Sequence, residues 1–226
     1  MNSDPKISCT FFTDFPVYFK EQGLPSSLEE IPLEYFERAF QWLENQKEII
    51  PNDYTIIGGS KGAEIGLLLG SRYNPIKTVV GITPSSVIWQ GIPSSRLNIG
   101  KNPKSSWSFD GIGLPYVPSS LSSKDWLALL TSRLCKIAEK DLKNAAQLNE
   151  AQIPVERIQG KILLISAKKD QLWPSTYMCE QMMKRLVDNG FSYPFRHEVY
   201  DKGHSGLMMD KNVWRTVFNF LTEKTE

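Results

Sequence analysis

Short runs of hydrophobic residues recur along the chain, each bounded by glycine, proline or charged residues. The run Lys161 to Ala167 (KILLISA) has the length and composition of a strand that is buried on both faces of a parallel sheet. Ile76 to Thr83 (IKTVVGIT) and Tyr54 to Ile57 (YTII) share this character, whereas Phe195 to Tyr200 (FRHEVY) alternates more, as an outer strand does. These runs predict the strands of one sheet.

Patterns of helical period lie between these runs. Over residues 27–43 hydrophobic side chains recur every three or four positions, and Ser27 and Glu30 have the spacing of a capping box. Residues 174–188 form a second such pattern, which ends at an Asn-Gly pair, and residues 212–221 form a third. The alternation of strands and helices predicts an α/β fold with a mostly parallel sheet.

The segment Pro84 to Gln159 interrupts this alternation. It is rich in serine, proline and glycine, and it contains a helix-like stretch over residues 124–146. Because it lies between two strands of the expected sheet, we interpret residues 84–159 as an insertion that forms a cap or lid. The length of 226 residues fits a single domain spanning residues 1–226.

Charge and cysteine content narrow the possible partners. Lysine and arginine total 26 and aspartate and glutamate total 25, so the net charge of +1 argues against nucleic acid as a partner. No hydrophobic stretch reaches the roughly 20 residues of a membrane span, and the start of the chain lacks the pattern of a secretory signal. Cys9, Cys135 and Cys179 are too widely spaced for a metal site or a disulfide framework. We therefore expect no metal, no cofactor and a reducing, cytoplasmic location.

The pentapeptide Gly-Gly-Ser-Lys-Gly at residues 58–62 matches the G-x-S-x-G pattern of a nucleophile elbow. By itself, the pattern also fits an ordinary glycine-rich turn that binds phosphate or nothing. Here a strand is expected before it and a helix from Ala63 to Leu69 after it, which is the setting that an elbow requires. Ser60 is therefore the candidate nucleophile, and the backbone amide of Lys61 is the candidate oxyanion donor.

Candidates for the rest of a catalytic triad follow in chain order. A serine needs a base to accept its proton, and the base needs a carboxylate that orients it. Asp170 comes just after the strand Lys161 to Ala167, and His204 lies in the loop after the strand Phe195 to Tyr200. Ser60, Asp170 and His204 thus reproduce the nucleophile, acid and base order of α/β-hydrolases.

Other side chains could take the roles of base and acid. His197 is the second histidine of the chain, but it lies within a strand pattern, where a packing or surface role is more common. Asp201 and Asp188 are alternative acids, and Asp188 lies inside a helix pattern. The first choices therefore stay Asp170 and His204.

Four segments together resemble one protein family: Ile31 to Trp42 (IPLEYFERAFQW), Gly58 to Glu64 (GGSKGAE), Pro84 to Pro93 (PSSVIWQGIP) and Asp170 to Ser175 (DQLWPS). This family is the C-terminal catalytic domain shared by acyl-CoA thioesterases and bile acid-CoA:amino acid N-acyltransferases, a branch related to dienelactone hydrolases. The similarity extends from about Gly23 to Leu221, which is most of the chain.

The resemblance implies an α/β-hydrolase fold and an acyl-enzyme mechanism on small-molecule acyl-thioesters or related esters. It implies a serine or cysteine nucleophile at the position of Ser60, and Asp170 and His204 match the acid and base of the family. Several aromatic residues in the insertion then either line an apolar acyl pocket or form the insertion's own small core. These residues are Trp89, Trp107, Phe109, Tyr116 and Trp126.

The chain departs from this pattern upstream of the elbow. A full α/β-hydrolase has there a strand ending in a glycine-rich loop, and the loop supplies a second oxyanion donor. Residues 1–23 have room for one strand, over residues 7–13, and contain no His-Gly or Gly-Gly pair. We therefore expect a fold shortened at its N-terminus, and the alternative to an active hydrolase is a catalytically silent acyl-binding or interaction protein. Peptidase activity ranks last, because nothing in the chain corresponds to the substrate-gating domain of many related peptidases.

Overall fold

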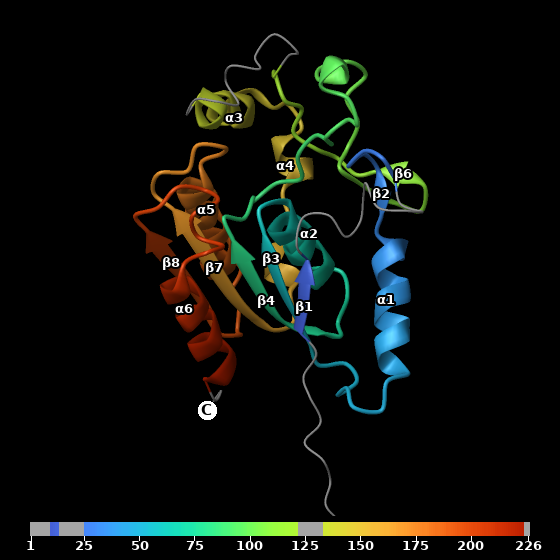
Figure 1. Cartoon of the computed structure of the whole chain (residues 1–226), viewed down its shortest axis with the longest axis vertical. Coiled ribbons are helices and arrows are strands. Elements are labelled where there is room, and N and C mark those ends of the chain that lie inside the picture. Colours follow the sequence, from blue (N-terminus) through green and yellow to red (C-terminus); the bar gives the residue numbers. More distant parts are fainter. Residues whose placement is uncertain (1–9, 14–24, 122–132, 224–226) are drawn as a thin grey trace, which may run out of the picture.

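A five-stranded sheet lies at the centre of the fold in the computed structural model, which describes residues 10–13, 25–121 and 133–223 (Figure 1). Every neighbouring pair of its strands is parallel, so all carboxyl ends meet at one edge of the sheet. The predicted α/β fold with a mostly parallel sheet is confirmed. In spatial order the strands are β1 (Thr10–Thr13), β3 (Tyr54–Gly59), β4 (Ile76–Ile82), β7 (Lys161–Ala167) and β8 (Phe195–Tyr200).

Helices cover both faces of this sheet (Figure 1). Residues of α1 (Glu34–Glu44), α2 (Lys61–Gly70) and α5 (Ser175–Asp188) share one buried hydrophobic cluster with the first face. Residues of α6 (Lys211–Thr222) share a second cluster with the opposite face. The sheet is therefore the middle of three layers, which is why its inner strands are hydrophobic on both sides.

The inner strand β4 illustrates how side chains divide between the layers. Successive side chains of a strand point to opposite faces, and Val79 belongs to the first cluster whereas Val80 belongs to the second. Both are fully buried. The continuous hydrophobic runs in the sequence thus correspond to strands without a solvent-facing side.

The C-terminal helices agree with their sequence patterns. Helix α5 begins one residue after the start of the pattern over 174–188, and α6 exceeds the pattern over 212–221 by one residue at each end. Gly190 follows α5 with a φ of 63°, the left-handed conformation that commonly ends a helix. The prediction that an Asn-Gly pair ends this helix is confirmed.

The helix expected over residues 27–43 begins later than the pattern does. Helix α1 starts only at Glu34, and it has no side-chain cap. Glu30, the expected partner in a capping box, has a φ of 52° and lies outside the helix. The residues before α1 instead form β2 (Ile31–Pro32), which pairs with β5 (Trp107–Phe109). Pairing with a strand far along the chain therefore outweighs the local helical pattern here.

The segment between β4 and β7 lies beyond the carboxyl ends of the central strands in Figure 1. Its strand β5 pairs with β2 on one side and with β6 on the other to give a second, three-stranded sheet. Of the helix-like stretch over 124–146, the part up to residue 132 lies outside the described residues. The further elements of the segment are β6 (Ile112–Gly113), α3 (Arg133–Asn144), α4 (Leu148–Ala151) and 3-10 turns at Arg96–Asn98 and Val155–Arg157.

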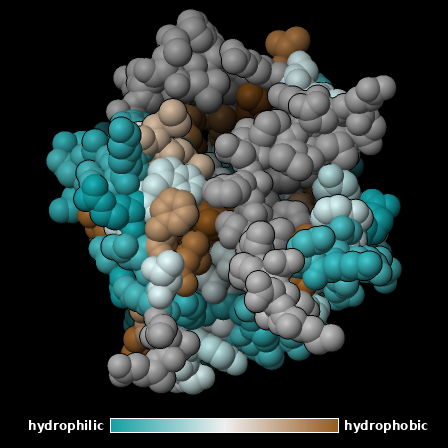
Figure 2. Space-filling view, turned by 60° about the horizontal axis from the view of Figure 1, so that its bottom comes forward, coloured by the Kyte–Doolittle hydropathy of each residue, from teal (hydrophilic) through white to brown (hydrophobic). Residues whose placement is uncertain are grey.

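Figure 2 turns the lower part of the molecule, with the amino-terminal ends of the strands, toward the viewer. The described residues seen there are largely hydrophilic, with a narrow hydrophobic band near the centre of the view. No helix in the described part of the chain is both long and apolar enough to cross a membrane. The loops that carry the candidate triad leave the opposite edge of the sheet.

Candidate active site

Ser60 lies in the turn between β3 and α2. Its φ of 54° and ψ of −119° are strained for an L-residue, which is the conformation that a nucleophile elbow imposes. Its backbone amide donates a hydrogen bond of 2.8 Å to the Ile82 carbonyl at the end of β4. A Cβ atom on Gly58 would overlap the carbonyl of Gly62, so this turn closes only because residue 58 is glycine.

Helix α2 begins directly after Ser60. Its first intrahelical hydrogen bonds run from the backbone amides of Ala63 and Glu64 to the Ser60 carbonyl, at 3.0 and 3.1 Å. The amide of Lys61 is at the first helical position, where no acceptor exists within the helix. The helix dipole adds partial positive charge at this end. The start of α2 therefore favours negative charge beside Ser60.

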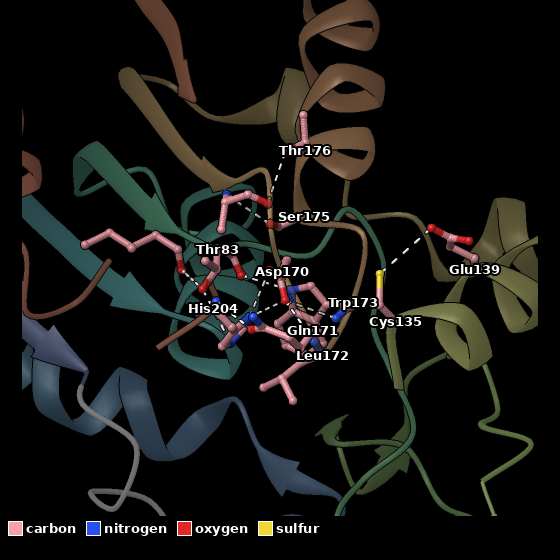
Figure 3. A network of polar contacts seen from close by, with 12 residues as sticks. Thr83, Cys135, Glu139, Asp170, Gln171, Leu172, Trp173, Ser175, Thr176 and His204 are labelled. Atoms are coloured by element: carbon pink, nitrogen blue, oxygen red, sulfur yellow. Dashed lines mark hydrogen bonds and ion pairs between the residues drawn. The ribbon is translucent and has the colours of Figure 1, made fainter. Parts of the chain in front are cut away.

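Asp170 and His204 come together from the loops that follow β7 and β8 (Figure 3). The Nδ1 atom of His204 lies 2.9 Å from each carboxylate oxygen of Asp170. The two side chains are only 7% and 3% exposed, respectively, so water screens the contact weakly. When the Nδ1–H group donates a hydrogen bond to this carboxylate, Nε2 is the ring nitrogen left to accept a proton.

The loop after Asp170 orients both members of this pair. Asp170 Oδ1 accepts hydrogen bonds from the backbone amides of Leu172 at 2.9 Å and Trp173 at 3.3 Å. The side chain of Gln171 accepts a hydrogen bond of 3.3 Å from the His204 backbone amide. The Trp173 indole contacts the His204 ring edge-on, with 5.2 Å between ring centroids. Local backbone hydrogen bonds thus hold the Asp170 carboxylate, and the indole limits rotation of the His204 ring.

The Nε2 atom of the imidazole faces the end of β4. His204 Nε2 lies 3.5 Å from the hydroxyl of Thr83, which follows Ile82, the acceptor for the Ser60 amide. The Met208 side chain lies directly over Gly59, so the loop that carries His204 also covers the elbow. Among the described residues the side-chain hydrogen bonds of His204 go to Thr83 and Asp170, and none joins it to the Ser60 hydroxyl.

Thr83, Gln171 and Trp173 were not predicted as site residues. Thr83 is fully buried with a φ of 48°, and its carbonyl accepts a hydrogen bond of 3.1 Å from the Trp173 indole. Gln171 and Trp173 fall in the DQLWPS segment that carries the family resemblance, which was the signal available for them. Thr83 gave no such signal, because its role depends on which loops meet at the end of β4.

The alternative base and acids lie elsewhere. His197 on β8 is hydrogen-bonded to the Ser166 hydroxyl at 2.8 Å, and burial lowers the pKa of its imidazole. Asp201 forms an exposed ion pair with Lys169, and Asp188, at the end of α5, forms one with Lys184. None of these three candidates contacts His204 or the elbow through an interaction among the described residues.

Two of the insertion's aromatic residues are core residues. Trp107 is fully buried and packs edge-on against Phe36 of α1, with 6.4 Å between ring centroids. Trp89 is 6% exposed and belongs to a small cluster that residues of the insertion form with Met178 of α5. Phe109 is 39% exposed, and Trp126 lies outside the described residues. For Trp89 and Trp107 the structure favours a structural core over an acyl pocket.

A cavity of about 730 Å³ opens beside this cluster, between the segment after β4 and helices α3 and α5. Val87, Leu142 and Met182 line it together with charged residues, whereas the candidate triad does not. Among the residues that the structure describes, no group of three or more histidine, cysteine, aspartate or glutamate side chains is arranged to hold a metal ion.

Comparison with known proteins identifies the family. The family model described as "BAAT / Acyl-CoA thioester hydrolase C terminal" matches residues 31–206, a range that includes Ser60, Asp170 and His204. The chain belongs to this family. The resemblance carried by the four sequence segments is thereby confirmed.

Named relatives of this family member include enzymes of two kinds. It is 27% identical to mouse "Acyl-coenzyme A thioesterase 2, mitochondrial" over 177 residues, which cover 78% of this chain and 35% of the relative. It is 30% identical to rat "Acyl-coenzyme A amino acid N-acyltransferase 2" over 176 residues, which cover 77% of this chain and 38% of the relative. The chain thus spans little more than a third of the length of these proteins.

A solved structure agrees on the fold. The acylaminoacyl peptidase of Pyrococcus horikoshii superposes with a TM-score of 0.52 at 12% sequence identity, covering 85% of this chain and 28% of the peptidase. At this identity the likeness shows the α/β-hydrolase fold and nothing about substrates. The predicted fold class is confirmed.

Cys135 lies close to Asp170, because its backbone amide donates a hydrogen bond of 2.9 Å to the carbonyl of Gln171. Burial, Glu139 and Asp170 raise the pKa of its thiol to about 11. Burial also raises the pKa of the Cys179 thiol. Thiols with raised pKa values are poor nucleophiles at neutral pH, so neither cysteine competes with Ser60.

Gly58→Ala tests the elbow. Because the new Cβ would overlap the Gly62 carbonyl, we expect the free energy of unfolding to fall by more than about 3 kcal/mol. Urea unfolding monitored by circular dichroism measures this change. Gly206→Ala is the control, since its Cβ would meet nothing closer than 3.4 Å. A Gly58→Ala protein as stable as the control would contradict the turn geometry.

The low reactivity of Cys135 is also testable. With a pKa of about 11, only about one thiol in a thousand is ionised at pH 8, so iodoacetamide should modify it far more slowly than in urea-unfolded protein. Glu139→Gln removes a carboxylate that raises this pKa and should speed the modification. Peptide mapping by mass spectrometry measures each rate; equal rates in folded and unfolded protein would contradict the raised pKa.

Proposed function

We propose that this chain is a serine hydrolase that acts on small-molecule acyl-thioesters, or related carboxylic esters, through an acyl-enzyme on Ser60. The observation that carries the proposal is the buried Asp170–His204 pair, with Nε2 facing the end of β4 where the Ser60 elbow is anchored. Membership of a family that includes thioesterases and acyltransferases supports the substrate class.

In the proposed reaction the Ser60 hydroxyl oxygen attacks the acyl carbonyl carbon, and His204 Nε2 takes the hydroxyl proton. Asp170 holds the imidazole and stabilises the imidazolium that forms. The carbonyl oxygen becomes an oxyanion next to the Lys61 amide. When the intermediate collapses, the carbon–sulfur bond breaks and His204 returns the proton to the departing thiol. Water then attacks the acyl-enzyme by the same route, releasing the acid and Ser60.

The position of strand β1 is relevant to the source of a second oxyanion donor. It pairs in parallel with β3, and Thr13 at its end lies opposite Gly58 of the elbow. A strand therefore occupies the place beside the elbow from which this fold supplies its second donor. Residues 14–24, which follow it, lie outside the described residues.

The remaining expectations belong to the same proposal. We propose that residues 1–226 act as one hydrolase domain, that residues 84–159 cap its site and that it works in the cytoplasm. Neither nucleic acid nor a cofactor has a part in the reaction. A catalytically silent acyl-binding protein is the alternative, and the first experiment separates the two.

Ser60→Ala should abolish labelling of the protein by a fluorophosphonate probe, which reacts with activated serines. Ser71→Ala, at the other end of the same helix, is the control and should label normally. His204→Ala should lower kcat on acyl-CoA and p-nitrophenyl ester substrates by at least about a thousandfold. Labelling of the Ser60→Ala protein, or no turnover by the wild type, would contradict the proposal. A second experiment adds glycine to the reaction, and analysis of the products then separates hydrolysis from transfer of the acyl group to an amine.

Asp170→Asn should lower kcat by on the order of a thousand- to ten-thousandfold, because the amide donates toward Nδ1 and puts the imidazole proton on Nε2. The Asn oxygen can still accept from Leu172 and Trp173, so folding should survive. Asp201→Asn is the control: its carboxylate is in an exposed pair, and we expect a change below about twofold. Steady-state kinetics with thermal melts measures both, and equal kcat values would assign the acid elsewhere.

A further inference from the structure

A charged pair is buried behind the elbow, on the first turn of α2. The Lys61 ammonium lies 2.9 Å from both carboxylate oxygens of Glu64 and donates a hydrogen bond of 2.7 Å to the Ser106 hydroxyl. The two side chains are 4% and 0% exposed. The residue next to the candidate nucleophile therefore directs its charge into the protein, away from solvent.

The same carboxylate joins α2 to two segments of the insertion. Glu64 Oε1 accepts a hydrogen bond of 2.8 Å from the Trp107 indole of β5 and one of 3.3 Å from the Trp89 backbone amide. The Ser106 hydroxyl in turn donates to the Trp89 carbonyl at 2.8 Å. The pair is thus the centre of a network that ties the elbow helix to β5 and to the segment after β4.

Stability alone is a poor explanation for this arrangement. Burial disfavours both charges, lowering the pKa of Lys61 and raising that of Glu64, and only their mutual contact and hydrogen bonds oppose it. Replacing a buried ion pair by uncharged side chains of similar size is often neutral or stabilising. The pair instead fixes geometry, because several short charge-assisted hydrogen bonds hold the side chains that make them in one position.

The location of the pair indicates what is being positioned. The backbone amide of Lys61 is the proposed oxyanion donor, and the Lys61 side chain extends from the same residue into the network. An oxyanion donor must be held within a fraction of an ångström of its direction before the substrate arrives. We propose that Lys61 and Glu64 are positioning residues that hold the Lys61 amide toward the oxyanion. This inference rests on the proposed function.

The double variant Lys61→Met/Glu64→Gln tests it. Methionine replaces the lysine stem, and glutamine keeps an oxygen for the Trp107 indole, so the melting temperature should stay the same or rise. A misdirected donor should lower kcat by about ten- to a hundredfold, with KM unchanged and the rate of fluorophosphonate labelling reduced in proportion. If the pair were merely structural, its removal would lower the melting temperature and leave kcat per folded protein unaltered.

The control is Arg196→Met/Glu223→Gln, which removes an ion pair between β8 and the residue that follows α6. Its kcat should stay within about twofold of the wild type. If the first double variant does not fold, Trp107→Phe decides, because it removes one hydrogen bond to Glu64 and keeps a ring, and it should lower kcat severalfold. If the wild type is active and the folded variants are equally active, this inference alone is overturned. A wild type with neither turnover nor labelling overturns the proposed function with it.

Discussion

The close backbone approach at the end of β3 is the constraint on which the site depends. The Gly62 carbonyl occupies the space that a side chain at residue 58 would need. Because residue 58 is glycine, the backbone can approach this closely and turn sharply at Ser60, which has a φ of 54°. Helix α2 then starts immediately, so its amino-terminal end and the serine face the same edge of the sheet. Every proposed step at Ser60 requires the serine and the start of α2 to lie together at that edge.

Asp170 and His204 reach this edge because the sheet is parallel. The carboxyl ends of β7 and β8 lie side by side, so the loops that follow them place Asp170 and His204 in contact although 34 positions separate them in the chain. The Trp173 indole then connects this pair to the end of β4 through the Thr83 carbonyl. A parallel sheet can serve many reactions in this way, which is why the fold shared with an acylaminoacyl peptidase leaves the substrate open.

Much of the architecture was predictable because the inner strands carry continuous hydrophobic runs and the motif residues follow those strands directly. Local patterns were less reliable where distant segments pair. Residues 27–33 have a helical pattern, yet Ile31–Pro32 pairs with β5, since backbone hydrogen bonds to a remote strand outweigh a weak local preference. The burial of Lys61 was also beyond prediction, because the Ser106 hydroxyl that accepts from its ammonium is 45 positions away in the chain. The Trp107 indole that donates to its partner Glu64 is 43 positions from that glutamate.

The sequence by itself determined the order of the inner strands of the central sheet and of the helices between them, the glycine-flanked serine and the sequential positions of Asp170 and His204. These depend on short-range periodicity and on residue type. Only the tertiary structure decided that Thr83 and Trp173 border the imidazole and that Glu64 joins the elbow helix to the insertion. Contacts of that kind depend on how loops from separate strands meet at one edge of the sheet. The spacing of residues within one segment does not predict the hydrogen bonds that this segment forms with distant residues.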